Sequence, residues 1–555
     1  MRGTSLSLIV ILLVACAPAK QTVDLVMHHG AVHTMNPAQP DAEALAVNAG
    51  RIVAVGTNDA IARAYVGKET IDLQGQMALP GFHDAHAHPA YDGVTLSQCN
   101  LVDLDSIDAI VAKVRTCNDE QKGDGWLVGA GWNLALFPQA NPSKALLDAI
   151  SPTRPILLAG ADGHSSWANS KALELAGVKR GTPNPEKGVI ERDANGEPSG
   201  TLRETAQDLV RDVVPPVSAD ARREGLVKAL QMANGFGITS IVEAAARPDL
   251  IEAYRSLEAN GGLTARVVAS IAISDPNDLA EANALIRPQD RGTSARLRAD
   301  SVKLFIDGVL EGETAALLQP YLDRPNWSGE LKFKPAELNA LVTDLDRHGV
   351  QVHMHAIGDA AVREGLDAFA AARAANGPTD NRHHIAHLQL VDPADRPRFA
   401  ELGVIANFQA LWAFPDKYIT DVNLAQVGQA RVDQMYPIAS VLHAGARIVG
   451  GSDWAVSSMN PLLAIQTAVT RSDPTGQIPG VLNAAERVSL ADMLAAYTIN
   501  GAYLMHQEKD TGSLEVGKFA DVIVLSRDLT KIPAEEIGAV AVTRTILEGA
   551  TVYSK

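Results

Sequence analysis

The pattern of hydrophobic and polar residues differs between the two ends of the chain and its middle. Near the N-terminus, short apolar runs punctuated by glycines predict β-strands, and the C-terminal end repeats the pattern. The runs cover residues 24–27, 44–47, 51–56, 521–525 and 540–549. Because both ends are β-rich and the middle is not, we expect residues 23–76 and 508–555 to join in one small β-sandwich domain.

Between these ends, short β-branched runs alternate with longer helical patterns, as is typical of a parallel α/β architecture. The runs cover residues 77–84, 238–244, 266–271, 301–306, 351–355, 383–387, 404–408 and 447–451. They predict an α/β fold in which residues 77–507 form a (β/α)8 TIM-type barrel. The gap after the first run is too long for one crossover, so an insertion is expected at about residues 90–230.

The first residues of the chain have the pattern of a secretory signal. A positive start is followed by an apolar core over residues 6–14, which is too short for a permanent membrane span. The segment Leu13-Val14-Ala15-Cys16 resembles the bacterial lipobox, so residues 1–16 are expected to form a lipoprotein signal peptide, with cleavage before Cys16 and lipidation of that cysteine. We therefore expect a lipoprotein of the bacterial cell envelope that faces the periplasm, at the outer membrane, with an ordinary signal peptide as the alternative.

Composition narrows the function classes. The 555 residues carry a net charge of -17 and no Lys/Arg cluster, which excludes a nucleic-acid partner. Two of the three cysteines, Cys99 and Cys117, lie beyond the signal, and whether they pair in an oxidising compartment stays open.

The segment Leu79-Pro80-Gly81-Phe82-His83-Asp84-Ala85-His86-Ala87-His88-Pro89 carries the first chemical signal. Residues two apart in a strand face the same side, so His86 and His88 can aim two imidazoles at one point, while His83 faces the other side. Taken alone, a His-x-His pair is more often part of a polar loop than a metal site. The later strands must therefore supply further ligands.

Polar residues do stand at the ends of the predicted barrel strands, where the active sites of such barrels lie. They are His86, His88, Glu243, Lys303, Asp307, His355, His387, Gln409 and Asp453. Histidine and carboxylate suit a metal ion, whereas an ammonium repels one. Lys303 fits among ligands only if CO2 has converted its amine into a carbamate, which is an anion with two oxygens.

Several ordered motifs resemble the amidohydrolase superfamily, in particular the amidohydrolase 3 or YtcJ-like branch that includes N-substituted formamide deformylases. Besides the first histidine segment, they are Asp162-Gly163-His164-Ser165-Ser166-Trp167, Asn169-Ser170-Lys171-Ala172-Leu173, Val302-Lys303-Leu304-Phe305-Ile306-Asp307-Gly308, His353-Met354-His355-Ala356-Ile357-Gly358-Asp359, His384-Ile385-Ala386-His387 and Gly451-Ser452-Asp453-Trp454. The resemblance extends over the whole mature chain.

The resemblance implies two divalent metal ions, most often zinc. One ion would be held by His86, His88 and Asp453, the other by His355 and His387, with carboxylated Lys303 as the bridging ligand. A hydroxide shared by the ions would attack a carbonyl carbon, and Asp453 would move its proton to the leaving nitrogen.

Other residues have rival interpretations. His353 competes with His355, and His383 and His384 compete with His387; the family pattern favours His355 and His387 as ligands. His164 resembles a residue that reaches over the metals to bind substrate or stabilise the oxyanion, with a hydrogen-bonded loop histidine as its alternative. The remaining candidates for substrate binding are Gln409 and the aromatic residues Trp167 and Trp454. Aromatic residues are as often part of the core.

The expected activity is hydrolysis of a C–N bond in a small amide, N-formyl or carbamate substrate. An aminoacylase or a carbamate or ester hydrolase of the same fold is the alternative, followed by a non-catalytic surface binding protein. Ala386 stands where many relatives have an acidic residue, which leaves the ligand set intact and the substrate class open. Expected partners are the substrate and, through the lipid anchor, a membrane; a homodimer is left open.

Overall fold

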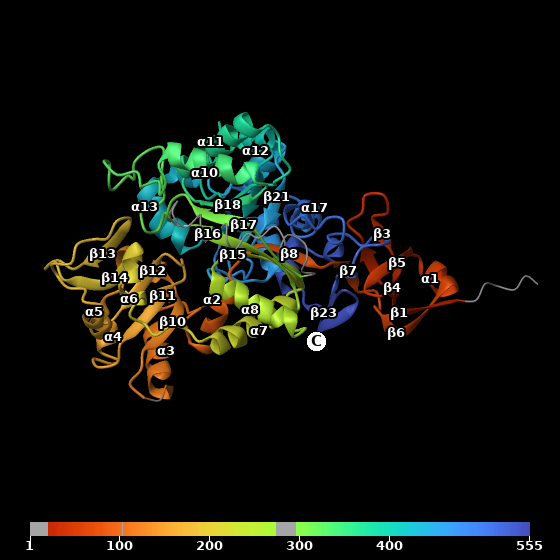
Figure 1. Cartoon of the computed structure of the whole chain (residues 1–555), viewed down its shortest axis with the longest axis horizontal. Coiled ribbons are helices and arrows are strands. Elements are labelled where there is room, and N and C mark those ends of the chain that lie inside the picture. Colours follow the sequence, from red (N-terminus) through yellow and green to blue (C-terminus); the bar gives the residue numbers. More distant parts are fainter. Residues whose placement is uncertain (1–19, 103, 122, 274–295) are drawn as a thin grey trace, which may run out of the picture.

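A barrel of eight parallel strands forms the centre of the molecule (Figure 1). The computed structural model describes residues 20–102, 104–121, 123–273 and 296–555. In sheet order the strands are β8 (Phe82–Ala87), β15 (Ile238–Ala246), β16 (Arg266–Ile273), β17 (Leu297–Phe305), β18 (Gln351–Ala356), β19 (His384–His387), β20 (Ile405–Phe408) and β21 (Ile448–Gly450). A parallel bridge between Ala87 and Trp454 links the first strand to the segment after the last, so the sheet is nearly closed. The predicted barrel is confirmed.

Helices surround the barrel strands and bury one apolar face each. They include α7 (Ala219–Gly235), α8 (Pro248–Ala259), α10 (Pro335–Arg347), α11 (Asp359–Asn376), α12 (Arg396–Leu402), α15 (Ile438–His443), α16 (Pro461–Thr470), α17 (Leu490–Ala496) and α18 (Ile499–Leu504). In α11, for example, Val362, Leu366 and Phe369 recur at helical spacing and enter the main core. Ser218 caps α7 by accepting a hydrogen bond from the backbone N–H of Ala221.

The two chain ends meet in a β-sandwich at the right of Figure 1. One sheet contains β5 (Arg51–Gly56), β4 (Ala44–Asn48), β1 (Gln21–His28) and β6 (Tyr65–Asp72), and α1 (Asn58–Ala64) lies beside it. The other contains β24 (Ala550–Ser554), β23 (Val542–Leu547), β22 (Val522–Leu525), β7 (Met77–Pro80), β2 (Ala31–His33) and β3 (Asp41–Ala42). The sandwich built from both ends is thus confirmed, while the exact domain bounds stay predictions.

The expected single strand over residues 77–84 is wrong in one respect. It is two strands in two different sheets, because β7 pairs with β22 in the sandwich and β8 pairs with β15 in the barrel. The chain passes between them at Gly81, whose N–H donates to the carbonyl of Asp521. A Cβ at this position would lie 2.1 Å from Oγ1 of Thr239, so only glycine fits the crossing.

The segment after β8 forms a separate six-stranded sheet at the left of Figure 1. Its strands are β13 (Gly188–Arg192), β14 (Pro198–Glu204), β12 (Ser165–Ala168), β11 (Ile156–Gly160), β10 (Leu127–Trp132) and β9 (Cys99–Asn100). Short helices pack on it: α3 (Ile107–Glu120), α4 (Lys144–Asp148), α5 (Ser170–Leu175) and α6 (Asp208–Arg211). The short helix α2 (Pro89–Asp92) instead packs against α7 and α8 of the barrel. A disulfide joins Cys99 to Cys117, whose Cα atoms are 5.7 Å apart.

The expected signal peptide and lipidated Cys16 lie outside the described residues. Among the helices that the structure describes, none is both long and apolar enough to cross a membrane.

Candidate metal centre

The histidine segment after β8 is fixed by hydrogen bonds to the loop after β21. Oδ1 of Asp84 accepts the backbone N–H of His86 and that of Ser452, each at 3.0 Å. The N–H of Asp453 donates to the carbonyl of His86 at 2.7 Å, and that of His88 to the carbonyl of Trp454 at 2.8 Å. The first and last strands of the barrel therefore present their polar side chains at one place.

Asp453 is the centre of this group. Its Oδ1 lies 3.2 Å from Nε2 of His86 and 3.0 Å from Nε2 of His88, and its Oδ2 lies 3.8 Å from Nδ1 of His387. Burial would raise the pKa of this carboxyl, but the neighbouring His86 ring and the hydrogen bonds from His86 and His88 lower it well below its usual range. Asp453 is thus an anion in a buried site.

His86, His387 and Asp453 meet the distance requirement for sharing one metal ion. Each offers a ligand atom, these atoms all lie within 4.8 Å of one another, and all three residues are buried. Both ring nitrogens of His387 are buried without a hydrogen-bond partner among the described residues. An unsatisfied buried polar atom destabilises a fold by about 1–3 kcal/mol, so a metal ion that takes the lone pair accounts for this arrangement.

The protonation state of three of the four expected histidine ligands also fits a metal; in His88, burial would lower the pKa, but Asp453 and Glu243 outweigh burial and raise it. Burial lowers the pKa of His86 to about 3, and burial lowers the pKa of His355 and His387 well below the ordinary value. The rings are therefore neutral at pH 7, which is the form in which imidazole binds a metal ion.

Lys303 lies inside this cluster. Its Nζ is 3.1 Å from Nε2 of His86, and the residue is 1% exposed. Burial lowers the pKa of the amine to about 7. A neutral amine reacts with CO2, so both the position and the protonation of Lys303 are compatible with a carbamate.

His355 and His387 lie next to each other, with ring centroids 4.4 Å apart. Nε2 of His355 hydrogen-bonds the carbonyl of Gly308 at 3.0 Å. The ring of His387 also stacks on Trp412, at a centroid distance of 5.6 Å and an interplanar angle of 3°. All six residues expected to bind metal are thus brought into one cluster; their roles as ligands stay predictions.

The rival histidines have other partners. Nε2 of His353 lies 2.9 Å from Nδ1 of His86, on the side of the ring away from Asp453, and its Nδ1 contacts Oγ of Ser270 at 3.3 Å. His353 therefore orients His86, as a group behind a metal ligand does. The ring of His384 lies against that of His353 in a tilted arrangement, with centroids 4.1 Å apart, and both of its nitrogens are buried without a partner among the described residues.

The two remaining histidines of these motifs point elsewhere. His83 contacts the carbonyl of Gly81 and Oγ1 of Thr511, each at 3.1 Å. His383 contacts Asp346 at 3.0 Å and stacks on Phe369.

His164 reaches the cluster from the insertion, where it precedes β12. Its ring centroid is 5.1 Å from that of His355. Its Nδ1 lies 3.1 Å from both carboxylate oxygens of Glu204. This position of His164 is compatible with both predictions, a residue that reaches over the metals and a hydrogen-bonded loop histidine, because the ring is hydrogen-bonded in either case.

Glu204 is a residue that sequence reasoning missed. It accepts hydrogen bonds from Oγ1 of Thr314 at 2.9 Å and from Nζ of Lys332 at 2.8 Å, both on the barrel side. Burial would raise the pKa of Glu204, but the charges of His164 and Lys332 lower it well below its usual range. No sequence signal marked it, because it lies at the end of an insertion strand, far along the chain from Lys332.

Trp412 was also missed. It stacks on His387, but it lies in a short 3-10 helix (Ala410–Trp412) after β20, and the sequence predicts no fixed place for such a connection. Its neighbour in sequence, Gln409, had been selected instead.

The residues expected to bind substrate, Trp167, Gln409 and Trp454, have different surroundings in the structure. Trp167 is fully buried, donates from Nε1 to the carbonyl of Ser143, and packs on Trp132 and Phe137. Trp167 therefore lies in the core of the insertion, which is the alternative that the sequence left open, and its substrate role stays a prediction. Gln409 is 1% exposed, donates to Asn407, and has a buried Oε1 without a partner in the described part of the chain.

Trp454 follows Asp453 and packs in the main core with 7% of its surface exposed. Substrate roles for Gln409 and Trp454 stay predictions.

Comparison with known proteins agrees with this architecture. Residues 69–553 match the amidohydrolase family. The putative amidohydrolase YtcJ of Bacillus subtilis is 30% identical, with 96% of this chain and 99% of that protein covered. The N-substituted formamide deformylase of Arthrobacter pascens is 28% identical over 96% of this chain and 99% of its own length.

A solved structure agrees as well. An uncharacterized metal-dependent hydrolase from Pyrococcus furiosus is 27% identical and superposes with a TM-score of 0.70, covering 91% of this chain and 100% of its own. With the family match extending over most of the chain and the barrel, sandwich and histidine motifs in place, this chain belongs to the amidohydrolase family.

Proposed function

We propose that this protein is a metal-dependent hydrolase that cleaves the C–N bond of a small amide, N-formyl or carbamate compound. The observation that carries the proposal is the buried group of His86, His387 and Asp453, whose ligand atoms lie within 4.8 Å of one another. A relative of similar length is a formamide deformylase, which supports the N-formyl class among these substrates.

The residues that would hold metal are His86, His88, Lys303, His355, His387 and Asp453, with Lys303 as a carbamate bridge between two ions, most simply zinc. When bound, such ions activate a water molecule and polarise a carbonyl group. The ligands come from five different barrel strands or the loops that follow them, so the site depends on the closed barrel.

The protein side chains have separate tasks in this reaction. The oxygen of water adds to the carbonyl carbon, the C–N bond breaks, and the departing nitrogen needs a proton. Asp453 is ionised and faces His387 through Oδ2, so it can take the proton from the water and transfer it to the nitrogen.

His164 would act from the insertion, next to His355. Its Nδ1 is engaged by Glu204, which leaves Nε2 for the substrate carbonyl oxygen. Burial lowers the pKa of His164, but the charge and hydrogen bond of Glu204 outweigh burial and raise it. A protonated ring can stabilise the negative charge that develops on that oxygen.

The experiment is a metal and activity assay on the purified full-length protein. We expect bound divalent metal and hydrolysis of at least one class in a panel of N-formyl, N-acyl and carbamate compounds. The Asp453→Asn variant should lose turnover by at least about 100-fold while retaining most of its metal. Asp220→Asn, at a carboxylate that is 78% exposed, is the matched control and should keep full activity.

Two outcomes would contradict the proposal. One is a protein with less than about one tight metal ion per chain that gains no hydrolysis from added zinc or manganese. The other is an Asp453→Asn variant as active as the wild type. Tight binding of a panel compound without turnover would favour the surface binding protein instead.

We also propose that the protein is a lipoprotein of the cell envelope, anchored through Cys16. The disulfide between Cys99 and Cys117 supports an oxidising compartment. Cys16→Ser should move the protein from the membrane fraction to the soluble fraction of an expressing bacterium; unchanged fractionation would contradict the anchor.

A further inference from the structure

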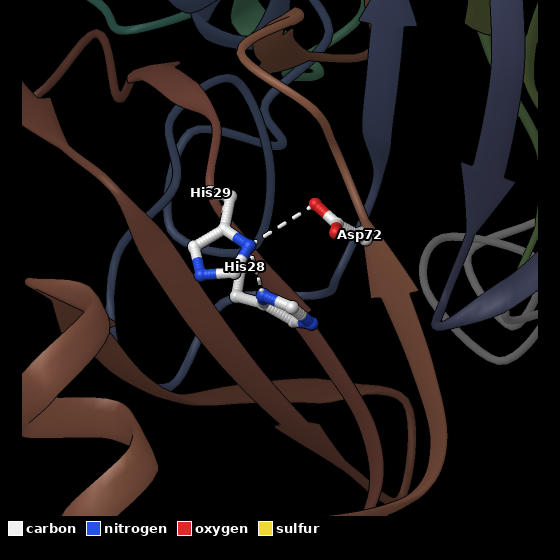
Figure 2. Close-up of side chains that lie close together, drawn as sticks. All are labelled: His28, His29 and Asp72. Atoms are coloured by element: carbon white, nitrogen blue, oxygen red, sulfur yellow. Dashed lines mark hydrogen bonds and ion pairs between the residues drawn. The ribbon is translucent and has the colours of Figure 1, made fainter.

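A second cluster of metal-binding side chains lies in the β-sandwich, on strands that carry none of the barrel cluster (Figure 2). It consists of His28, His29 and Asp72, whose ligand atoms also lie within 4.8 Å of one another. We propose that these three residues bind one divalent transition-metal ion, of the zinc, copper or nickel type, independently of the catalytic centre.

The backbone places the three side chains together. His28 and Asp72 end the parallel strands β1 and β6 and are direct partners in register, so their side chains leave the same face of the sheet. His29 would face the other side if the strand continued. Its φ of 56° is left-handed and turns its ring back toward His28 and Asp72.

Hydrogen bonds hold this turn in place without using the ring nitrogens. The carbonyl of His28 accepts from the N–H of Leu73 at 2.9 Å, and that of His29 from the N–H of Gly75 at 2.6 Å. The N–H of His29 donates to Oδ1 of Asn58 at 2.7 Å. The ligands are therefore largely positioned before an ion arrives.

The distances suit a tetrahedral ion. Nδ1 of His28 lies 2.9 Å from Nδ1 of His29, which lies 3.2 Å from Oδ1 of Asp72. Bonds of about 2.0–2.1 Å to a tetrahedral zinc ion separate neighbouring ligand atoms by about 3.3 Å. These two contacts need to change by only a few tenths of an ångström to match a coordination sphere. The ligand atoms of His28 and Asp72, which lie within 4.8 Å of each other, must approach further, by rotation of the half-exposed Asp72 side chain.

The chemistry of the contact favours a metal as well. Two neutral imidazoles whose Nδ1 atoms face each other can share only one hydrogen, whereas a divalent ion accepts both lone pairs. Two nitrogens and one carboxylate select zinc, copper or nickel over magnesium or calcium, which prefer oxygen ligands. His29 and Asp72 have side chains that are 57% and 48% exposed, so water can complete the coordination and the ion can exchange.

The test uses the full-length protein with its barrel metals in place. After dialysis into metal-free buffer, Zn2+ is titrated by calorimetry, and Co2+ is used to report the geometry through its visible absorption. We expect one further ion per chain, no binding of Mg2+ at this site, and unchanged hydrolysis. Because loss of even an outer partner weakens a metal site by about 10- to 100-fold, His29→Gly should weaken Zn2+ binding by at least about tenfold.

Glycine is chosen because it accepts the left-handed backbone of position 29, and Asp72→Asn is a second variant that preserves shape. His443→Ala, at an exposed histidine that ends α15, is the matched control and should bind as the wild type does. The proposal is overturned if the wild type takes up no ion beyond those of the barrel, or if both variants bind Zn2+ like the wild type. Neither result depends on hydrolysis, so the test of this metal site is independent of the proposed function.

Discussion

Lys303 is the residue whose environment is hardest to explain without a chemical modification. A free ammonium 3.1 Å from His86, among residues suited to bind cations, would repel any ion placed there. Burial brings the pKa of the amine down to about 7, so a substantial fraction is neutral at physiological pH. A carbamate would replace this amine with an anion that two ions can share.

Removing the amine should therefore remove the bridge. We expect Lys303→Ala to lose at least one metal ion per chain and at least about 100-fold in kcat/KM, with partial rescue by acetate or propionate, which supply a carboxylate in place of the carbamate. Metal analysis and rates with and without the acids measure this. Lys334→Ala, at an 83% exposed side chain, is the control; a Lys303→Ala variant that keeps both ions and full activity would refute the carbamate.

Glu204 should give a pH-dependent effect through His164. The folded-state pKa of His164 lies above its unfolded value because Glu204 outweighs burial. Such a group stabilises the fold below the unfolded pKa of about 6.5, and this stabilisation is lost as pH rises through the folded pKa. Glu204→Gln should therefore lower the unfolding midpoint more at about pH 6 than at about pH 9.

The same variant tests whether Glu204 positions His164 for catalysis. We expect kcat to fall by at least about tenfold with a smaller change in KM, because a positioned acid acts in the transition state. Glu204→Asp, which keeps the charge, should recover part of the rate, and Glu174→Gln, at a 69% exposed side chain, should change neither property. Equal losses for Glu204→Gln and Glu204→Asp at both pH values would indicate a packing role only.

Sequence alone could identify the ligand candidates because each stands in a short motif at a strand end, as His86 and Asp453 do. It could not choose between His353 and His355 without a family pattern, since both face the barrel interior; the contact between His353 and His86 explains the difference. Glu204 and Trp412 could not be found, because their partners are set by loop conformation. For Trp167 the sequence left both interpretations open, because aromatic residues in an insertion pack in its core as readily as they line a site; the structure places it in the core.

At the scale of elements, alternation of apolar runs located the barrel strands, since each run is short, buried and bounded by polar residues. Which sheet each predicted strand joins was harder to predict from the sequence. The apolar run that begins at residue 77 stops at Pro80-Gly81, and β7 and β8 on either side of this break belong to different sheets. The sequence marks the break but not the change of partner sheet.

This crossing gives a prediction for the element. A Cβ at position 81 would clash with Thr239, whose Oγ1 would be 2.1 Å away, so β8 or β15 must shift. Overpacking of this kind destabilises a protein by about 1–3 kcal/mol, and we expect Gly81→Ala to lower the unfolding free energy by that amount in urea denaturation. Gly181→Ala, where a Cβ meets nothing within 4 Å, is the matched control. Equal stability of the two variants would show that β8 and β15 can shift to accommodate the Cβ without loss of stability.

At the scale of the whole molecule, the sandwich and the barrel are connected by more than the chain. Arg266, at the start of β16 in the barrel, forms ion pairs with Asp521 and Glu548, which flank β22 and β23 in the sandwich. The guanidinium also lies over the ring of Phe519, 4.5 Å from its centroid. The side chains of Arg266 and Asp521 are 4% and 2% exposed, so their charges depend on each other rather than on water.

Replacing Arg266 should therefore affect stability far more than replacing a surface cation. Breaking a buried ion pair leaves an uncompensated charge and typically destabilises by about 3–5 kcal/mol, and we expect a loss of this size for Arg266→Ala in urea unfolding. The exposed pair of Lys334 with Glu337 is worth less than about 1 kcal/mol, so Lys334→Ala is the contrast. Because the sandwich holds both chain ends against the barrel, we also expect Arg266→Ala to reduce metal retention on mild heating. A variant as stable as Lys334→Ala would mean that apolar packing alone joins the two parts.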